Sequence, residues 1–239
     1  MSGNLPAIRQ ALVIGASRGI GLELVRQYRA DGVQVTATAR DDAGLARIAA
    51  LGAQALRLDV ATAAGCSGLA WQVDGAQFDA VWLVAGVYGP RQTGLQTPTQ
   101  AEFDTVMHTN VLAAMRLLPQ VAEALTPGAR VALLSSRMGS IGLRPAPAAS
   151  SAQAAPPSGW LYRASKAALN SVLADAAQAL AGRATCVALH PGWVQTDMGG
   201  TGADISVARS AADLRATVAG LTPAMSGRFF NHDGQPLAW

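Results

Sequence analysis

The stretch ALVIGASRGIGLELVRQYRA, residues 11–30, contains a short apolar run, a glycine-rich turn and a helical pattern in immediate succession. An apolar run bounded by glycine predicts a buried strand, and the apolar spacing that follows predicts a helix. The glycines at 15, 19 and 21 let the backbone approach a pyrophosphate, whose charge the helix N-terminus stabilises. Taken alone, the motif also allows a tight turn that binds no ligand.

The alternation of short apolar strands and longer helical patterns continues along the chain. VQVTATA follows the first helix and precedes an Ala/Leu-rich helix that ends near residue 51. This rhythm predicts an α/β fold: a doubly wound parallel sheet of about seven strands with helices on both faces. Thr99 and Glu102 form a capping-box pattern that opens a long helix running past Asn110 towards Leu125. The further predicted strands are AQALRLDV (53–60), FDAVWLVAG (78–86), ARVALLSS (129–136) and ATCVALHPG (184–192).

Length and composition narrow the class of protein. With 239 residues, 50% of them hydrophobic and 14% charged, residues 1–239 are expected to form a single domain. The net charge of +3 comes from scattered arginines, which does not favour nucleic acid as a partner. We expect no membrane segment and a cytoplasmic location, because apolar runs of about 18 residues are absent from the sequence. Cys66 and Cys186 are expected to be reduced core thiols, and no metal site is predicted.

Tyr162 and Lys166 lie four residues apart in WLYRASKAALN, residues 160–170, and Lys166 is the only lysine among 18 basic residues. Side chains at this spacing share one face of a helix. A nearby ammonium group favours the phenolate and is expected to lower the pKa of the tyrosine, which makes the pair a tunable proton donor. Lysine suits this task because it is a compact charge on a flexible stem. An accidental surface pair is the competing interpretation.

Taken together, these segments resemble the classical short-chain dehydrogenases/reductases over nearly the whole chain, which implies a Rossmann-type fold. In that family the tyrosine protonates the carbonyl oxygen, and the serine holds that oxygen. The lysine binds the nicotinamide ribose, and the asparagine holds a water that links the lysine to solvent. The matching catalytic positions are Asn110, Ser136, Tyr162 and Lys166, with Ser135 as the competing serine.

The same resemblance implies a binding site for a nicotinamide cofactor. The matching positions are Gly15, Ser17, Arg18, Gly19, Ile20, Gly21, Arg40, Asp59, Val60, Ala85, Gly86, Tyr162, Lys166, Pro191, Gly192, Val194 and Thr196.

Four segments carry a closer likeness: SSRMGSI (135–141), YRASKAALN (162–170), HPGWVQTDMGG (190–200) and the terminal NHDGQPLAW. They are similar to the branch that holds the C-factor-type proteins of bacteria and the sniffer-type carbonyl reductases of animals. This implies an NADPH-dependent reductase acting on a ketone, aldehyde or quinone, or the reverse alcohol dehydrogenase. The alternative is a signalling or nucleotide-sensing protein with little turnover. Epimerisation or dehydration on the same fold is disfavoured, because no second acid-base residue is evident.

Three departures from the family pattern stand out. The usual Thr before the first glycine is Ile14, and the usual Asn-Asn before Ala-Gly is Leu83-Val84. We interpret this joint loss as an apolar substitute for a hydrogen bond between strands. Ser136 and Tyr162 are also 26 residues apart, about twice the usual spacing. The Pro/Ala/Ser-rich stretch 144–159 accounts for the difference and is expected to be a mobile loop.

The end of the second predicted strand indicates which nicotinamide cofactor is used. NAD-binding Rossmann proteins place a carboxylate there, whereas this chain has Ala39 followed by Arg40. Arg18 is the second cation expected to face a 2′-phosphate, so NADP(H) is the expected cofactor. The alternative is that Asp41 or Asp42 binds the ribose, although both aspartates better suit the first turn of the next helix.

Substrate identity is the least determined feature. The pocket is expected to form from loops at 87–98, 137–160 and 197–210, whose Ala, Gly, Pro and Leu content favours a small apolar carbonyl or alcohol. The expected assembly is a homodimer or homotetramer.

Overall fold

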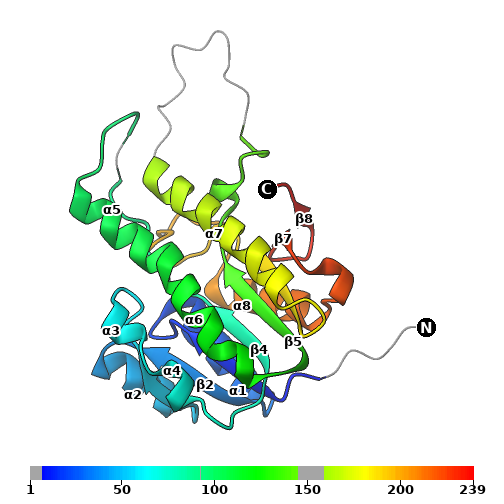
Figure 1. Ribbon diagram of the computed structural model, residues 1–239. Helices are drawn as coiled ribbons and strands as arrows, with labels where there is room; N and C mark the ends of the chain where they lie inside the picture. The colour runs from blue at the N-terminus through cyan, green and yellow to red at the C-terminus, as the bar shows by residue number, and fades with distance from the viewer. Residues whose placement is uncertain (1–6, 92, 145–158) are drawn as a thin grey trace.

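The computed structural model describes residues 7–91, 93–144 and 159–239 (Figure 1). The loop expected at 144–159 lies almost wholly outside these residues, and its mobility stays a prediction.

One mixed sheet organises the described residues, with strand order β3-β2-β1-β4-β5-β6-β7-β8. The first seven strands of this order run parallel, and β8 pairs antiparallel with β7. The predicted doubly wound sheet is confirmed, and the eighth strand beyond the expected seven is this two-residue pairing. The strands are β1 (Gln10–Ile14), β2 (Gln34–Ala39), β3 (Gln54–Arg57), β4 (Phe78–Leu83), β5 (Leu125–Leu134), β6 (Ala184–His190), β7 (Arg228–Asn231) and β8 (Pro236–Leu237).

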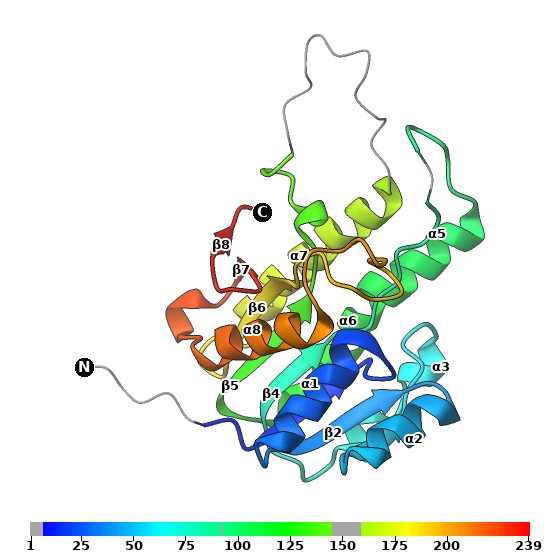
Figure 2. The same cartoon turned by 180° about the vertical axis from the view of Figure 1, so that it is seen from behind.

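Helices cover both faces of the sheet because successive strand residues point to opposite sides. In β1, Leu12 and Ile14 join the core beneath α6 (Ala113–Val121) and α7 (Trp160–Ala179). The alternate residues Ala11 and Val13 belong to the core on the other face, whose covering helices are seen in front of the sheet in Figure 2. Those helices are α1 (Gly19–Ala30), α2 (Asp42–Ala50) and α8 (Val207–Ala219).

The helix expected from Thr99 to Leu125 begins as predicted but is not continuous. The Thr99 hydroxyl and the Glu102 carboxylate make both bonds of the capping box at the start of α5 (Gln100–Met107). A π-helical turn, η1 (His108–Leu112), then separates α5 from α6, and β5 already begins at Leu125. Such turns occur often at functional sites, and this one carries Asn110.

The order of the strands places the site. The chain builds β2 and β3 on one side of β1 and then crosses over to β4 on the other side, and ligands of such sheets bind at this switch point, beyond the carboxyl ends of the strands. The remaining elements are short: α3 (Ala63–Cys66), α4 (Leu69–Gln72), η2 (Ala122–Ala124), η3 (Arg137–Gly139) and η4 (Pro223–Met225). None of the helices described is both long and apolar enough to cross a membrane.

Candidate active site

The glycine-rich turn closes against the end of β4 so tightly that two of its positions admit only glycine. Gly15 has φ +91°, and a Cβ there would lie 2.6 Å from the Ala85 backbone nitrogen. A Cβ on Gly21 would lie 2.2 Å from the Gly15 carbonyl oxygen. Arg18, at the N-cap of α1, makes no side-chain capping bond, so the first N–H groups of this 12-residue helix are open to an anion. The turn therefore fits a pyrophosphate.

Thr38 of β2 holds this turn in place, which sequence reasoning missed. Its hydroxyl oxygen accepts a hydrogen bond from the Gly15 N–H at 3.1 Å, and its carbonyl accepts from the Ala16 N–H at 2.8 Å. Thr38 is buried, so its hydroxyl needs a hydrogen-bond partner, but the sequence alone does not distinguish it from Thr36 in the same strand.

Three arginines lie around the part of the cradle where the 2′-phosphate is expected: Arg18 at the start of α1, Arg40 after β2 and Arg47 in α2. Arg18 is exposed and pairs with the exposed Asp197 at 3.0 Å. An exposed ion pair of this kind contributes only about 0–1 kcal/mol, so a phosphate can displace it. Arg40 is also exposed, and Arg47, which sequence reasoning missed, donates from Nε to the Ser17 carbonyl at 2.8 Å.

The two aspartates after Arg40 serve the next helix. The Asp41 carboxylate caps α2 by accepting from the Gly44 N–H at 2.7 Å, and Asp42 lies in the first turn. Both aspartates therefore belong to α2, as expected from the sequence. The positive charge of Arg40, directly before them, remains beside the glycine-rich turn.

Asn110, Lys166 and Gly86 converge beyond β4. A Cβ on Gly86 would lie 3.3 Å from Asn110 Oδ1 and 3.4 Å from Lys166 Nζ. Asn110 clamps the adjoining peptide, since its Oδ1 accepts from the Val87 N–H and its Nδ2 donates to the Val87 carbonyl, both at 2.8 Å. Asn110 Nδ2 also donates to Ser165 Oγ at 2.9 Å. The π-helical turn thus fixes the strand end beside the lysine.

Tyr162 and Ser136 meet despite the 26 residues between them. Both are buried, and their side chains are hydrogen-bonded to each other. The competing Ser135 instead donates its hydroxyl hydrogen to Asn170 Oδ1 at 2.5 Å, so its hydroxyl is engaged elsewhere. This geometry favours Ser136 as the partner of the tyrosine.

The expected lowering of the Tyr162 pKa is wrong for this structure. Burial raises the pKa of Tyr162 to about 12, against a smaller lowering by the hydrogen bond with Ser136. Lys166 Nζ lies 5.8 Å from the centroid of the tyrosine ring and donates to the Leu134 carbonyl at 2.8 Å. Burial also lowers the pKa of Lys166 to about 8. Desolvation therefore outweighs the ammonium at this distance.

The segment after β6 forms the opposite wall. Gly192 has φ +87°, and a Cβ there would lie 2.6 Å from Ile205 Cδ1. Val194 is buried and bridges to Ile205, while the Thr196 hydroxyl accepts from the Gly199 N–H at 3.1 Å. The Pro191 carbonyl accepts from the Ser210 hydroxyl at 2.7 Å. This wall reaches the glycine turn, because a Cβ on Gly19 would lie 3.6 Å from Thr196 Cγ2.

The remaining predicted cofactor residues, Asp59 and Val60, follow β3. The Asp59 carboxylate accepts from the Ala61 N–H at 3.0 Å, which fixes the turn, and Val60 packs against the core. The structure thus gathers the predicted residues at the carboxyl edge of the sheet, and the cradle fits a nicotinamide dinucleotide.

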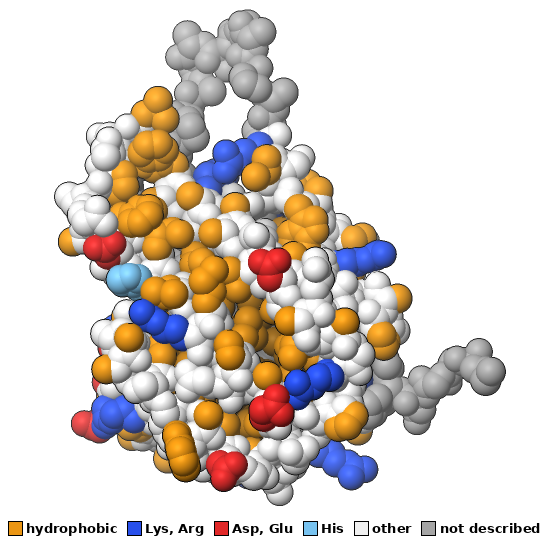
Figure 3. Space-filling view, in the orientation of Figure 1, with side chains coloured by type: hydrophobic (Ala, Val, Ile, Leu, Met, Phe, Trp, Pro, Cys, Tyr) orange, Lys and Arg blue, Asp and Glu red, His pale blue; other side chains and the backbone are white. Residues whose placement is uncertain are grey.

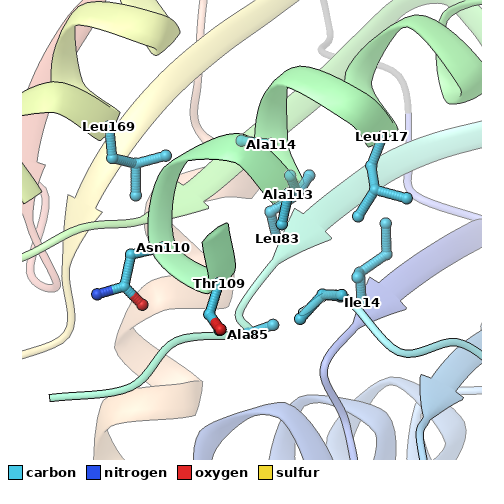
Figure 4. A pocket seen from close by; sticks show the side chains of 10 residues that line it. Ile14, Leu83, Ala85, Thr109, Asn110, Ala113, Ala114, Leu117 and Leu169 are labelled. Carbon is cyan, nitrogen blue, oxygen red and sulfur yellow. The ribbon is translucent and has the colours of Figure 1, made fainter. Parts of the chain in front are cut away.

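The apolar contact at Ile14 yields a stability prediction. Ile14 is 1% exposed and lies with Leu83 and Leu117 on the wall of a cavity of about 20 Å³ (Figure 4). A hydroxyl introduced there would be buried beside Leu83 and Leu117, in a cavity whose lining is mostly apolar apart from Thr109 and Asn110. We expect Ile14→Thr to lower the free energy of unfolding by about 1–3 kcal/mol more than Ile14→Val does, because its buried hydroxyl lacks a partner, and urea denaturation measures both values.

Ile14→Val is the matched control, because valine has nearly the shape of threonine without the hydroxyl. It should cost only about 0.5–1.5 kcal/mol. A threonine variant as stable as the valine variant would show that a hydroxyl at position 14 costs no stability. The joint replacement of the family's polar residues by Ile14 and Leu83-Val84 would then have no structural role.

Comparison with known proteins agrees with this geometry. Residues 9–204 match the family model described as short chain dehydrogenase. A 1-hydroxy-2-glutathionyl-2-methyl-3-butene dehydrogenase of Rhodococcus sp. (strain AD45) is 32% identical over 239 residues, which cover 95% of this chain and 98% of the relative. The C-signal protein of Myxococcus xanthus is 38% identical over 133 residues, 54% of this chain and 74% of the relative.

Solved structures extend the likeness to the whole fold. The carbonyl reductase Sniffer of D. melanogaster superposes with a TM-score of 0.81 at 27% identity, covering 98% of this chain and all of that one. The NADPH-bound carbonyl reductase from chicken fatty liver gives a TM-score of 0.81 at 29% identity with the same coverage. The chain therefore belongs to the short-chain dehydrogenase family, in its carbonyl reductase and C-factor branch.

Proposed function

We propose that this protein is an NADPH-dependent oxidoreductase that reduces a ketone, aldehyde or quinone to the alcohol, or catalyses the reverse reaction. The observation that carries the proposal is the buried, hydrogen-bonded pair of Tyr162 and Ser136. Lys166 lies one turn after Tyr162 on α7, with Nζ near the tyrosine ring. The structures of NADPH-bound carbonyl reductases that it resembles support this proposal.

Each side chain of the site has a separate role in the reduction of the carbonyl. When bound in this cradle, NADPH would supply the hydride. The hydroxyls of Ser136 and Tyr162 hold the carbonyl oxygen, and the raised pKa of Tyr162 keeps the phenol protonated until the oxygen takes the proton. Lys166 Nζ holds the ribose hydroxyls, and Asn110 fixes the adjoining strand end. The alcohol product leaves with the proton of Tyr162, which solvent then replaces.

The cofactor choice gives a second prediction. Arginine grips phosphate through charge-assisted hydrogen bonds that contribute on the order of 1.5–3 kcal/mol each. We expect kcat/KM to be at least tenfold larger with NADPH than with NADH, since about 1.4 kcal/mol is a factor of ten. Replacing Arg18 and Arg40 together by Gln should narrow this ratio, measured by steady-state kinetics with both cofactors.

Two features shape this experiment. Ala39 is buried against Gly44, so a carboxylate placed there would itself be buried and confuse the result. Arg228→Gln is the control for the loss of a guanidinium, because it removes one positive charge at the amino end of β7, away from the carboxyl ends of the strands. Equal efficiency with NADPH and NADH in the unmodified protein would refute the roles of Arg18 and Arg40.

The proposed function itself is tested by NADPH oxidation against a panel of quinones, aldehydes and ketones, with alcohols and NADP⁺ for the reverse direction. Turnover of at least one carbonyl that depends on Tyr162 is the expected result. Failure of every member of both panels, with NADPH still bound, would contradict it.

That contradicting result would favour the second candidate, a signalling or nucleotide-sensing protein. Its support is the likeness to C-signal over 54% of the chain. Catalysis is nevertheless favoured, because a pure sensor does not need groups placed for proton transfer. This chain has such groups in the side chains of Asn110, Ser136, Tyr162 and Lys166.

We also propose an oligomeric state, a substrate class and a domain organisation for this protein. Apolar side chains gather over the face that carries α5, α6 and α7 (Figure 3), where Phe103 and Met115 are 44% and 52% exposed. This supports the proposed homodimer or homotetramer. A small apolar carbonyl remains the proposed substrate class, and residues 1–239 the proposed single domain.

A further inference from the structure

Tyr88, which the sequence motifs do not single out, lies against the proposed general acid. The rings of Tyr88 and Tyr162 are stacked, with centroids 4.7 Å apart and planes at 22°. Stacked aromatic pairs stabilise each other beyond the area they bury. Tyr88 comes from the loop after β4 and Tyr162 from the first turn of α7, so the stack joins two segments that are distant in sequence.

Neighbouring residues fix the position of Tyr88. Asn110 holds the preceding peptide through both the N–H and the carbonyl of Val87. Gly159, the N-cap of α7, has φ +68°, and a Cβ there would lie 2.3 Å from the Tyr88 hydroxyl oxygen. The glycine at the start of α7 therefore leaves room for the Tyr88 ring, and a larger residue at position 159 would collide with it.

Arg91 extends the contact towards the wall after β6. Its guanidinium carbon lies 5.0 Å from the centroid of the Tyr88 ring, within the range of a cation–π contact. Arg91 Nη2 also donates to the Met198 carbonyl at 2.9 Å. Contacts thus run from the segment that carries Thr196, through Arg91 and Tyr88, to the ring of Tyr162.

We propose that Tyr88 is a positioning residue for Tyr162: by stacking on the phenol ring, it holds the hydroxyl in place beside Ser136. This inference rests on the proposed carbonyl reductase function. The stack fixes the plane of the ring, while the hydroxyl of Tyr88 contributes little. Phenylalanine should therefore replace Tyr88, and an aliphatic residue should not.

Kinetics of Tyr88→Leu and Tyr88→Phe test this. In Tyr88→Leu we expect kcat to fall about tenfold or more, because small misplacements of a reacting group are costly, while KM changes less than threefold. The Kd for NADPH should stay within twofold. Tyr88→Phe should keep at least a third of the wild-type kcat. Leucine and phenylalanine variants with equal kcat, or a leucine variant that loses only NADPH binding, would overturn the proposal.

A second readout does not depend on turnover. The chain has three tyrosines, Tyr28, Tyr88 and Tyr162, so ring-labelled tyrosine gives few NMR signals, which Tyr162→Phe assigns. Loss of the stack in Tyr88→Leu should shift the Tyr162 ring signals, and Tyr88→Phe should largely preserve them. Tyr28, bonded to Trp82 on the other side of the sheet, is the internal reference.

The two readouts separate the two possible failures. A wild-type protein that reduced no carbonyl would contradict the proposed function, and the NMR signals would then judge the stack alone. Tyr162 signals unchanged by Tyr88→Leu would overturn the positioning role whatever the kinetics show.

Discussion

Tyr162→Phe is expected to lower kcat for carbonyl reduction at least about 100-fold, the loss typical of removing a general acid. The Kd for NADPH should stay within twofold, because the ring, its stack on Tyr88 and the neighbouring Lys166 are all retained. Only the transferable proton and the hydrogen bond with Ser136 are lost. Steady-state kinetics and fluorescence titration with NADPH measure the two quantities.

Tyr28→Phe is the matched control. It also removes one buried tyrosine hydroxyl, which here accepts from Trp82 Nε1 at 3.2 Å in the core on the α1 face of the sheet. It should lower thermal stability with little effect on kcat. If Tyr162→Phe kept more than a tenth of the wild-type rate, another group would have to supply the proton.

Lys166→Arg is expected to lower kcat/KM about 100-fold although the positive charge is kept. Lys166 is 3% exposed, its Nζ donates to the Leu134 carbonyl, and a Cβ on Gly139 would lie 2.7 Å from its Cβ. The planar guanidinium fork is wider than an ammonium and cannot make the same single contact in this space. Steady-state kinetics and thermal unfolding are measured on the same preparation.

Lys166→Met separates shape from charge, because methionine fills the site without an ammonium. Both variants should lose about 100-fold or more in kcat/KM, and the methionine variant should be the more stable, since it buries no charge. A fully active Lys166→Arg protein would show that the single lysine is an accident of composition.

Much of the fold could be predicted because its signals are local. The run ALVI is apolar on both sides, as a strand buried between two helical layers must be, and VQVTATA is a short run in which valine, threonine and alanine predominate. Thr99 and Glu102 sit three residues apart, so the start of α5 could be read from the chain alone. Neither β7 nor β8 was located from the sequence, because Arg228–Asn231 is only four residues long and Pro236–Leu237 is too short to show any periodicity.

The missed parts of the site depend on contacts between distant segments. Val87 and Asn110 are 23 residues apart, so the clamp that accompanies the π-helical turn has no local signature. The stack of Tyr88 on Tyr162 needs a loop and a helix that only the fold brings together. The pKa of Tyr162 was misjudged because spacing on a helix predicts the neighbouring charge but not the burial that outweighs it.

Transfer of deuterium from [4-²H]NADPH to a carbonyl substrate tests the central claim most directly. Both C4 epimers of the labelled cofactor are incubated with wild-type protein and with Tyr162→Phe, and the alcohol is analysed by mass spectrometry. The account predicts one deuterium on the carbinol carbon from one epimer only, with one NADPH consumed per alcohol and about 100-fold less product from Tyr162→Phe. Tight NADPH binding with no labelled alcohol from any carbonyl would contradict it.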